Sequence, residues 1–129
     1  MKYYIYCDGG TSNNQTPEFR RAYYSYKIYD NDRNVIDEKY QEPLGTQTNN
    51  EAEYLALIMA LEKIPDSVEE ITVYSDSQLV VNQLNGTFAI KKPHLRELVQ
   101  RVKDYQISKK IPIFLLWTPR ENIMKELGH

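Results

Sequence analysis

The chain has 129 residues, of which 41% are hydrophobic and 26% are charged. This balance is typical of an ordinary globular protein, and the length fits one core, so we expect a single domain over residues 1–129. The formal net charge of -2 and the pI of about 5.7 exclude a strongly basic nucleic-acid-binding domain. Any polyanion must therefore be bound locally.

Cellular location is predicted from what the sequence does not contain. The single cysteine, Cys7, cannot form an internal disulfide bond. The N-terminal residues have no signal-peptide pattern, and no apolar run approaches the ~20 residues that a membrane span needs. We therefore expect a cytoplasmic protein that makes no membrane contact and acts as a monomer.

The first part of the chain predicts three strands in an antiparallel meander. Tyr and Ile favour strands, and the second strand alternates with a period of two. The expected elements are a strand over residues 2–7 that ends at Asp8, a loop over 9–20, a strand over 20–30, a turn at 30–33 and a strand over 34–42.

The second part predicts helices between two further strands. Residues 51–64 are rich in Ala, Leu, Glu and Met and apolar nearly all round, which predicts a central, buried helix. The elements expected after it are a strand over 69–76, a short helix over 77–86, a helix starting near Pro93, an apolar strand over 111–119 buried on both faces, and a short helix over 121–129. This order predicts an α/β fold, a mixed sheet with helices on its faces.

Three acidic residues stand at the predicted ends of elements. Asp8 ends the first strand, Asp76 ends the fourth, and Glu53 lies in the first turn of the central helix. Taken singly, each has a simpler explanation: Asp8 with its glycines as a turn, Glu53 as a helix-start acid after an Asn49 or Asn50 cap, Asp76 as a cap. Ligands gather at the carboxyl ends of strands in α/β sheets, and convergence of all three by chance is improbable. We therefore expect one joint site.

Clustered carboxylates repel one another, so their natural partner is a hard divalent cation such as Mg²⁺. Two such ions about 3.5 to 4 Å apart can activate a water and stabilise the leaving oxygen of a phosphodiester. Gly9 and Gly10, next to Asp8, would then leave room for a polymer backbone. The sequence predicts a site for two Mg²⁺ ions, with Mn²⁺ as a possible substitute.

Four phrases, DGG, TNNEAEYLAL, YSDSQLVVNQLNG and WTPREN, resemble the type 1 branch of ribonuclease H, in its compact form without the basic protrusion. The resemblance covers nearly the whole chain. It implies a ribonuclease H-like α/β fold, a five-stranded mixed sheet of order 3-2-1-4-5 with helices on both faces. It also implies endonucleolytic hydrolysis of the RNA strand of RNA/DNA hybrids, giving 5′-phosphate and 3′-hydroxyl ends. Without the protrusion, weak and salt-sensitive hybrid binding is expected.

The resemblance also implies which residues bind metal and which contact the substrate. Asp8, Glu53 and Asp76 match the first three metal-binding, catalytic carboxylates. The residues expected at the substrate are Gly9, Gly10, Asn14, Thr48, Asn49, Asn50, Ser77 and Gln78. Amide side chains offer a donor and an acceptor to the 2′-hydroxyl, which distinguishes RNA from DNA, so recognition should follow backbone shape rather than base sequence.

The sequence departs from the family near its C-terminal end. The fourth family carboxylate is an Asp four residues after an Asn, and here Glu126 stands four residues after Asn122. We expect Glu126 to complete the catalytic, metal-binding set, while an alignment one residue shorter would put Lys125 there instead. Glu126 as an exposed helix acid remains an alternative, and with it a second hypothesis, a catalytically weakened nucleic-acid-binding domain. Arg120 is either a positive charge near the site or a partner in a surface ion pair.

Overall fold

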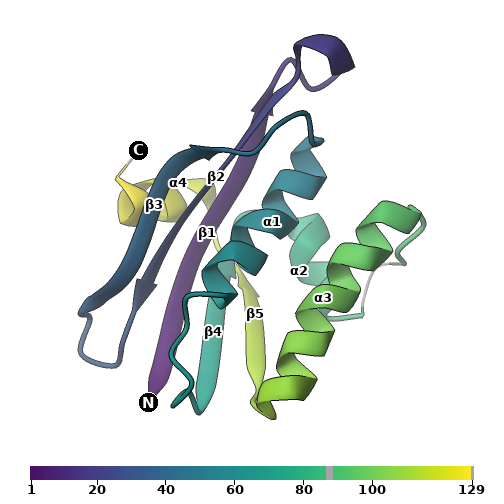
Figure 1. Ribbon diagram of the computed structural model, residues 1–129. Coiled ribbons are helices and arrows are strands. Elements are labelled where there is room, and N and C mark those ends of the chain that lie inside the picture. Colours follow the sequence, from purple (N-terminus) through teal and green to yellow (C-terminus); the bar gives the residue numbers. More distant parts are fainter. Residues whose placement is uncertain (87–88, 129) are drawn as a thin grey trace.

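The computed structural model describes residues 1–86 and 89–128, so His129, the last residue of the predicted terminal helix, lies outside the described residues. The elements are β1 (Lys2–Ser12), the 3-10 helix η1 (Pro17–Phe19), β2 (Arg21–Tyr29), β3 (Val35–Pro43), α1 (Asn49–Leu61), β4 (Glu70–Ser75), α2 (Gln78–Leu84), α3 (Pro93–Lys109), β5 (Ile113–Trp117) and α4 (Arg120–Leu127). Figure 1 shows their arrangement.

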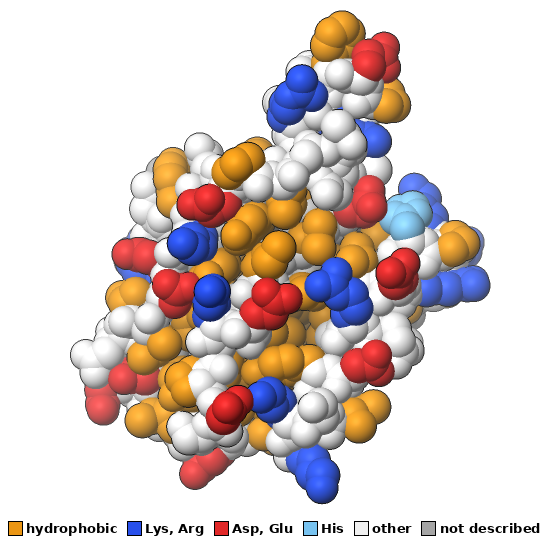
Figure 2. All heavy atoms as spheres, viewed as in Figure 1, with side chains coloured by type: hydrophobic (Ala, Val, Ile, Leu, Met, Phe, Trp, Pro, Cys, Tyr) orange, Lys and Arg blue, Asp and Glu red, His pale blue; other side chains and the backbone are white. Residues whose placement is uncertain are grey.

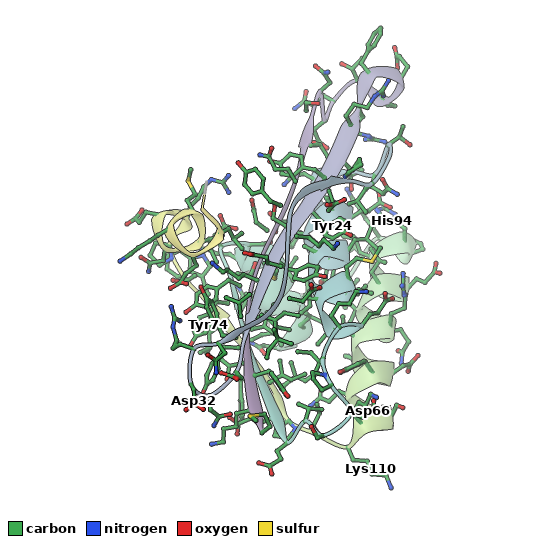
Figure 3. All side chains as sticks on the ribbon, turned by 60° about the vertical axis from the view of Figure 1, so that its left-hand side comes forward. Tyr24, Asp32, Asp66, Tyr74, His94 and Lys110 are labelled. Carbon is green, nitrogen blue, oxygen red and sulfur yellow. The ribbon has the colours of Figure 1, made fainter. Side chains whose placement is uncertain are left out.

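The strands form one mixed sheet in the order β3-β2-β1-β4-β5, which confirms the predicted fold. β2 runs antiparallel to both β1 and β3, while β4 runs parallel to β1 and to β5. Helices α1 and α3 cover one face of the sheet, and α4 lies on the other (Figures 1 and 3). Parallel strands 1 and 4 therefore lie side by side at the centre, with their carboxyl ends at the same edge.

β1 is longer than predicted, because residues 9–12 belong to the strand and not to a loop. They pair with β2 as far as Ser12 opposite Arg21, and this ladder outweighs the low strand propensity of glycine and serine. The pairing of β1 with β4 ends earlier, at Tyr6 opposite Tyr74. Beyond that point β2 still has β3 as its other neighbour as far as Tyr23 opposite Pro43, and only the end of β1 and the start of β2 form a two-stranded hairpin, which projects past the rest of the sheet (Figure 1).

The core lies between the sheet and α1, which is buried along most of its length as predicted. Tyr54, Leu57 and Leu61 of this helix pack with strand residues such as Ile5 and Ile71 in one continuous hydrophobic cluster. Burial on this scale fixes the height and rotation of α1 against the sheet, since interiors are close-packed. The helix is therefore a rigid platform for the side chains of its first turns.

The start of α1 is fixed by a capping box. The Thr48 hydroxyl accepts a hydrogen bond from the Glu51 backbone N–H at 3.2 Å, and the Glu51 carboxylate accepts one from the Thr48 N–H at 2.9 Å. The cap is thus Thr48, so the alternative of Asn49 or Asn50 as cap was wrong. Both amides lie inside the first turn of α1. Satisfying two helix N–H groups at once sharpens the helix start.

The prediction that the last strand is buried on both faces was wrong. β5 is an edge strand with β4 as its neighbour, and Phe114 and Leu116 are 48% and 46% exposed. A run of apolar residues indicates a buried strand only if the strand is central, which the local sequence does not reveal. Among the described residues, no helix combines the length and the apolar character that crossing a bilayer requires.

Candidate active site

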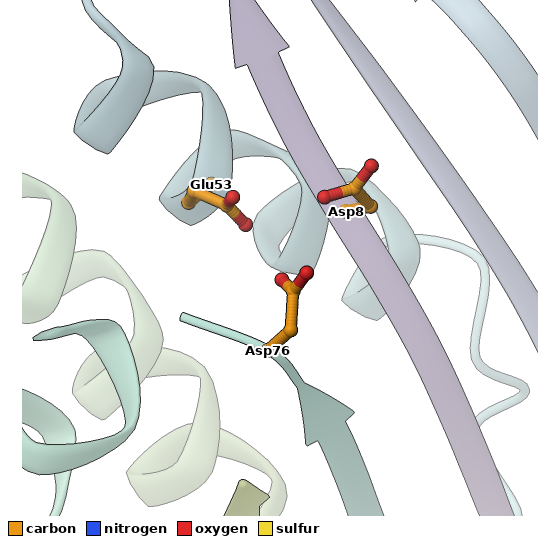
Figure 4. Close-up of side chains that lie close together, drawn as sticks. All are labelled: Asp8, Glu53 and Asp76. Carbon is orange, nitrogen blue, oxygen red and sulfur yellow. The ribbon is translucent and has the colours of Figure 1, made fainter. Parts of the chain in front are cut away.

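Three carboxylates from three elements meet where β1 and β4 separate. Asp8 lies on β1 two residues beyond the last β1–β4 pair, Asp76 directly follows β4, and Glu53 comes from the first half of α1. One oxygen of each carboxylate lies within 4.8 Å of the others. Figure 4 shows the three side chains pointing toward one common point. We call these three residues the carboxylate trio.

The trio is shielded from water. Asp8 is 1% exposed and Glu53 is 8% exposed, while the Asp76 side chain is 10% exposed. Glu53 is oriented by the backbone N–H of Gly9, which donates to its Oε2 at 3.2 Å. Burial, followed by the negative charges of Asp8 and Asp76, raises the pKa of Glu53 well above its ordinary value. Ionising all three carboxylates is therefore unfavourable unless a cation joins them.

A guanidinium supplies part of that positive charge. The Nη1 atom of Arg120 lies 2.9 Å from Asp76 Oδ2 and 3.4 Å from Asp8 Oδ1. Arg120 is the first residue of α4, and its side chain is 53% exposed. Of the two roles that the sequence left open for Arg120, the structure supports a positive charge near the site.

The donor set of the trio fits a divalent metal ion. It offers only carboxylate oxygens, which are the ligands that Mg²⁺ prefers in proteins, and they converge within 4.8 Å. Burial, followed by the charges of Asp8 and Asp76, keeps the pKa of Glu53 raised even beside Arg120. The Arg120 side chain is half exposed, so its guanidinium lies at the solvent side of the trio and not in the core.

The structure does not bring Glu126 to the trio. Its Oε2 accepts a hydrogen bond from the Tyr29 hydroxyl at 2.9 Å, and Arg33 lies 3.3 Å from the same carboxylate. Glu126 sits in the last turn of α4, so its position follows the packing of that helix across β1 and β2. Lys125, the alternative, lines a cavity of about 300 Å³ with Tyr6 and Tyr74.

The predicted substrate-binding amides form a polar surface beside the trio. Asn14, Thr48, Asn49 and Asn50 line a pocket of about 270 Å³. The Asn49 backbone N–H donates to Asn14 Oδ1 at 3.0 Å, which ties the β1–β2 hairpin to the start of α1. We call this pocket the polar pocket. Its remaining wall residues are Arg20, Lys92, His94 and Leu95.

Sequence reasoning had not assigned Arg20, Lys92 and His94 to this surface. They come from the hairpin and from the start of α3, which are far apart in the chain. The packing of α3 beside α1 places Lys92 and His94 around the same pocket as Arg20. No local pattern predicts that neighbourhood.

The two glycines after Asp8 lie where the chain packs closely against its own residues. Both are buried, and a Cβ atom on Gly9 would clash with the backbone of Ala52 in α1. On Gly10 it would meet the phenol group of Tyr23. The close neighbour of Gly9 is therefore the protein's own helix, while the prediction that the two glycines leave room for a polymer stays a prediction.

The remaining predicted residues lie at the start of α2. Ser77 caps this helix, because its hydroxyl accepts a hydrogen bond from the Val80 N–H at 3.2 Å, and Asp76 is not the cap. Gln78 follows as the first residue of α2 and is exposed. The Asp76 carboxylate is left facing Asp8, Glu53 and Arg120 rather than the helix.

The sheet order and the position of the trio together define a nuclease-like fold of the ribonuclease H class. The family model RNase H matches residues 1–117. The chain belongs to the ribonuclease H family.

Relatives share about a third of the sequence. The bifunctional protein Rv2228c of Mycobacterium tuberculosis is 34% identical over 99 residues, which are 76% of this chain and 26% of that protein. Ribonuclease HI of Halobacterium salinarum is 34% identical over 102 residues, which are 78% of this chain and 49% of that protein. The chain thus spans between a quarter and a half of the length of these relatives.

Solved structures agree over nearly the full chain. The N-terminal RNase H domain of Rv2228c, solved as a fusion with maltose-binding protein, has a TM-score of 0.85 and 32% identity, covering 98% of this chain and 95% of that one. LC11-RNase H1, solved in complex with an RNA/DNA hybrid, has a TM-score of 0.83 and 32% identity, covering 97% and 92%.

Proposed function

We propose that this chain is a metal-dependent endoribonuclease that hydrolyses the RNA strand of RNA/DNA hybrids, leaving 5′-phosphate and 3′-hydroxyl ends. The observation that carries the proposal is the carboxylate trio, three repelling and largely buried acids within 4.8 Å of one another. Membership of the ribonuclease H family and the likeness to a structure that holds a hybrid support the choice of substrate.

Asp8, Glu53 and Asp76 would hold two divalent ions, Mg²⁺ or Mn²⁺. When bound, such a pair supplies an activated water and stabilises the leaving oxygen of the phosphodiester. The protein contributes fixed ligand positions: Gly9 N–H orients Glu53, and burial keeps water from competing for the carboxylates. Arg120 gives up the shared oxygens and remains nearby as a cation for substrate phosphate.

The substrate would lie across the polar pocket. Asn14, Asn49 and Asn50 present amide groups that can bond to 2′-hydroxyls and backbone oxygens, and exposed Gln78 extends this surface beyond Asp76. Thr48 also lines the pocket. Arg20 and Lys92 add positive charge for phosphates in a chain of net charge -2. These contacts are made to the sugar-phosphate backbone of the nucleic acid and not to the bases, so we expect no base-sequence preference.

A second candidate function is nucleic-acid binding without efficient cleavage. The placement of Glu126 beside Tyr29 and Arg33 favours it, because the trio then lacks the fourth carboxylate that the family resemblance implies. The buried trio itself argues against it, since a domain that only binds a polyanion gains nothing from three adjacent negative charges.

The test is cleavage of an end-labelled RNA/DNA hybrid beside duplex DNA, duplex RNA and single-stranded RNA, with Mg²⁺, with Mn²⁺ and with a chelator. We expect metal-dependent cleavage confined to the RNA of the hybrid. Asp76→Asn should abolish cleavage and keep hybrid affinity. The matched control is Asp32→Asn, at an exposed acid in the β2–β3 turn (Figure 3), which should cleave normally.

Each other outcome has a definite meaning. A folded, metal-loaded protein that binds the hybrid but cuts nothing would establish the second candidate function. Undiminished cleavage by Asp76→Asn would refute the metal site assigned to the trio.

A further inference from the structure

The tip of the β1–β2 hairpin, residues 13–20, presents an exposed aromatic ring on a well-ordered turn. Phe19 is 61% exposed. Its backbone is held by the Phe19 N–H to Thr16 carbonyl bond at 2.9 Å and by the Asn13 side-chain amide, which donates to the Phe19 carbonyl at 3.2 Å. Pro17 starts the short 3-10 helix that carries Phe19. We call this segment the hairpin tip.

The hairpin tip is also tied to the body of the protein. The Nε atom of Arg20 donates to the Thr46 carbonyl at 2.7 Å, and its Nη1 donates to the Asn14 carbonyl at 3.2 Å. Asn14 in turn accepts the hydrogen bond from Asn49 at the start of α1. These bonds connect the segment that carries Phe19 to the body of the protein and to the start of α1.

The position of the tip makes it continuous with the proposed substrate surface. Asn14 and Arg20 belong both to the tip and to the wall of the polar pocket. Figure 2 shows the tip projecting from the body of the molecule, with hydrophobic side chains and an Asp or Glu side chain at its extremity and Lys or Arg side chains below them. A polymer lying over the polar pocket and continuing in this direction would pass along the tip.

The distance suits a duplex and not a small molecule. The end of β1 lies four residues beyond Asp8, or about 13 Å at the rise of a strand. For a duplex that runs parallel to β1 and advances about 3.4 Å per base pair, this length corresponds to roughly four base pairs from a phosphate held at the trio. A ligand that fills only the active site would not reach Phe19.

The local charge favours a polyanion. The tip contains Arg20 and one acid, Glu18, and Arg21 directly follows it. Lys92 lines the polar pocket together with Arg20. The whole chain carries a net charge of -2, so this end of the molecule is more positive than the average. An exposed aromatic ring flanked by cations is suited to a nucleic-acid backbone, where the ring contacts sugars or bases and the cations contact phosphates.

We propose that the hairpin tip is a second contact for the hybrid, with Phe19 lying against sugar rings in the minor groove, several base pairs from the cleaved phosphate. The wide, shallow minor groove of an A-form-like duplex admits such a side chain. Arg20 and Arg21 contact phosphates beside it. This inference rests on the proposed function, and it adds a directional requirement: the duplex must extend on the side of the tip.

The experiment compares two substrates with the same short ribonucleotide block inside one strand of a DNA duplex. One duplex extends by about a helical turn, roughly 10 base pairs, on the 5′ side of the block, and the other extends equally on the 3′ side. We measure kcat/KM for the wild-type chain and for Phe19→Ala. Phe114→Ala removes a comparably exposed aromatic ring from β5 and serves as the matched control.

We expect Phe19→Ala to lower kcat/KM about five- to tenfold on one of the two substrates, because KM rises. A loss of this size is near the lower end of the contributions that aromatic contacts make to nucleic-acid binding. The other substrate and the Phe114→Ala control should be unchanged, and thermal unfolding should confirm that both variants are folded. Equal loss on both substrates, or no loss on either, overturns the proposed contact. If the wild-type chain cuts neither substrate, the proposed function itself has failed, which separates the two conclusions.

Discussion

At the scale of single residues, Glu53 experiences opposing effects. Burial and the charges of Asp8 and Asp76 disfavour its ionised form, while the Gly9 N–H and Arg120 favour it, and the disfavouring effects dominate. The folded chain therefore holds the Glu53 proton more tightly than the unfolded chain does. Stability then falls as the pH rises above about 4.3, the ordinary pKa of Glu, and through the raised value.

This balance predicts the behaviour of Glu53→Gln. Without metal, the variant should melt higher than the wild-type chain above this pH window, and the difference should shrink as the pH falls toward the ordinary Glu range. Cleavage should fall more than about a hundredfold, because even residues behind metal ligands contribute 10- to 100-fold. Thermal unfolding across pH, in chelator, provides the measurement. A variant that melts lower at alkaline pH would show that Glu53 stabilises the metal-free fold.

Gly9 predicts a second effect at a single position. Ala at this position has to displace the backbone of Ala52, and backbone in a packed helix has no alternative conformer to adopt. We expect Gly9→Ala to lower the free energy of unfolding by about 3 kcal/mol, at the upper end of overpacking effects. Gly45→Ala is the control, since its added methyl meets only the flexible side chain of Gln47. Equal urea midpoints for the two variants would contradict this account of Gly9.

At the scale of elements, α4 presents one end to the trio and the other to the sheet. Its first residue, Arg120, contacts Asp8 and Asp76, while Glu126 in its last turn contacts Tyr29 and Arg33. The Arg33 side chain is 59% exposed, so its ion pair contributes little, and the Tyr29 hydroxyl bond is the better sheltered contact. We infer that Glu126 anchors α4 and thereby positions Arg120.

The variant Glu126→Ala separates anchoring from metal binding. As an anchor, its loss should lower the free energy of unfolding by about 1 kcal/mol, the usual size of one lost hydrogen bond, and leave cleavage within a few-fold of wild type. As a metal ligand, its loss should abolish cleavage. Glu121→Ala, in the first turn of the same helix, is the control and should change neither quantity. Urea unfolding and hybrid cleavage on the same preparations decide between the two roles.

Features that depend on one segment could be predicted from the sequence, whereas features that depend on contacts between distant segments could not. The succession of strands and helices along the chain and the burial of α1 were predictable, because they depend on periodicity and propensity within each segment, whereas the strand order of the sheet came from the family resemblance. The exposure of β5 and the continuation of β1 through Ser12 could not be predicted from the local sequence, since both depend on which segments, distant in the chain, pack against or pair with these strands. The trio was foreseeable as three acids at element ends, whereas Arg120 and Lys92 reach their places only through the packing of α4 and α3.

At the scale of the whole molecule, the trio exists only in the folded state, because β1, α1 and the end of β4 must all be in place to bring its members together. A cation that binds the trio therefore stabilises the fold by mass action. At a concentration a hundred times the dissociation constant, this linkage contributes about 2.7 kcal/mol. For a domain of this size, such a contribution raises the melting temperature by roughly 10 °C.

We therefore expect Mg²⁺ to raise the melting temperature in a saturable manner, and a chelator to reverse the rise. Asp76→Asn should lose most of the rise, while Asp32→Asn, which removes the same charge from an exposed turn, should keep it. Potassium chloride at matched ionic strength controls for screening of the net charge. A rise of equal size in Asp76→Asn would mean that Mg²⁺ acts elsewhere on the molecule, since linkage through the trio requires all three of its carboxylates.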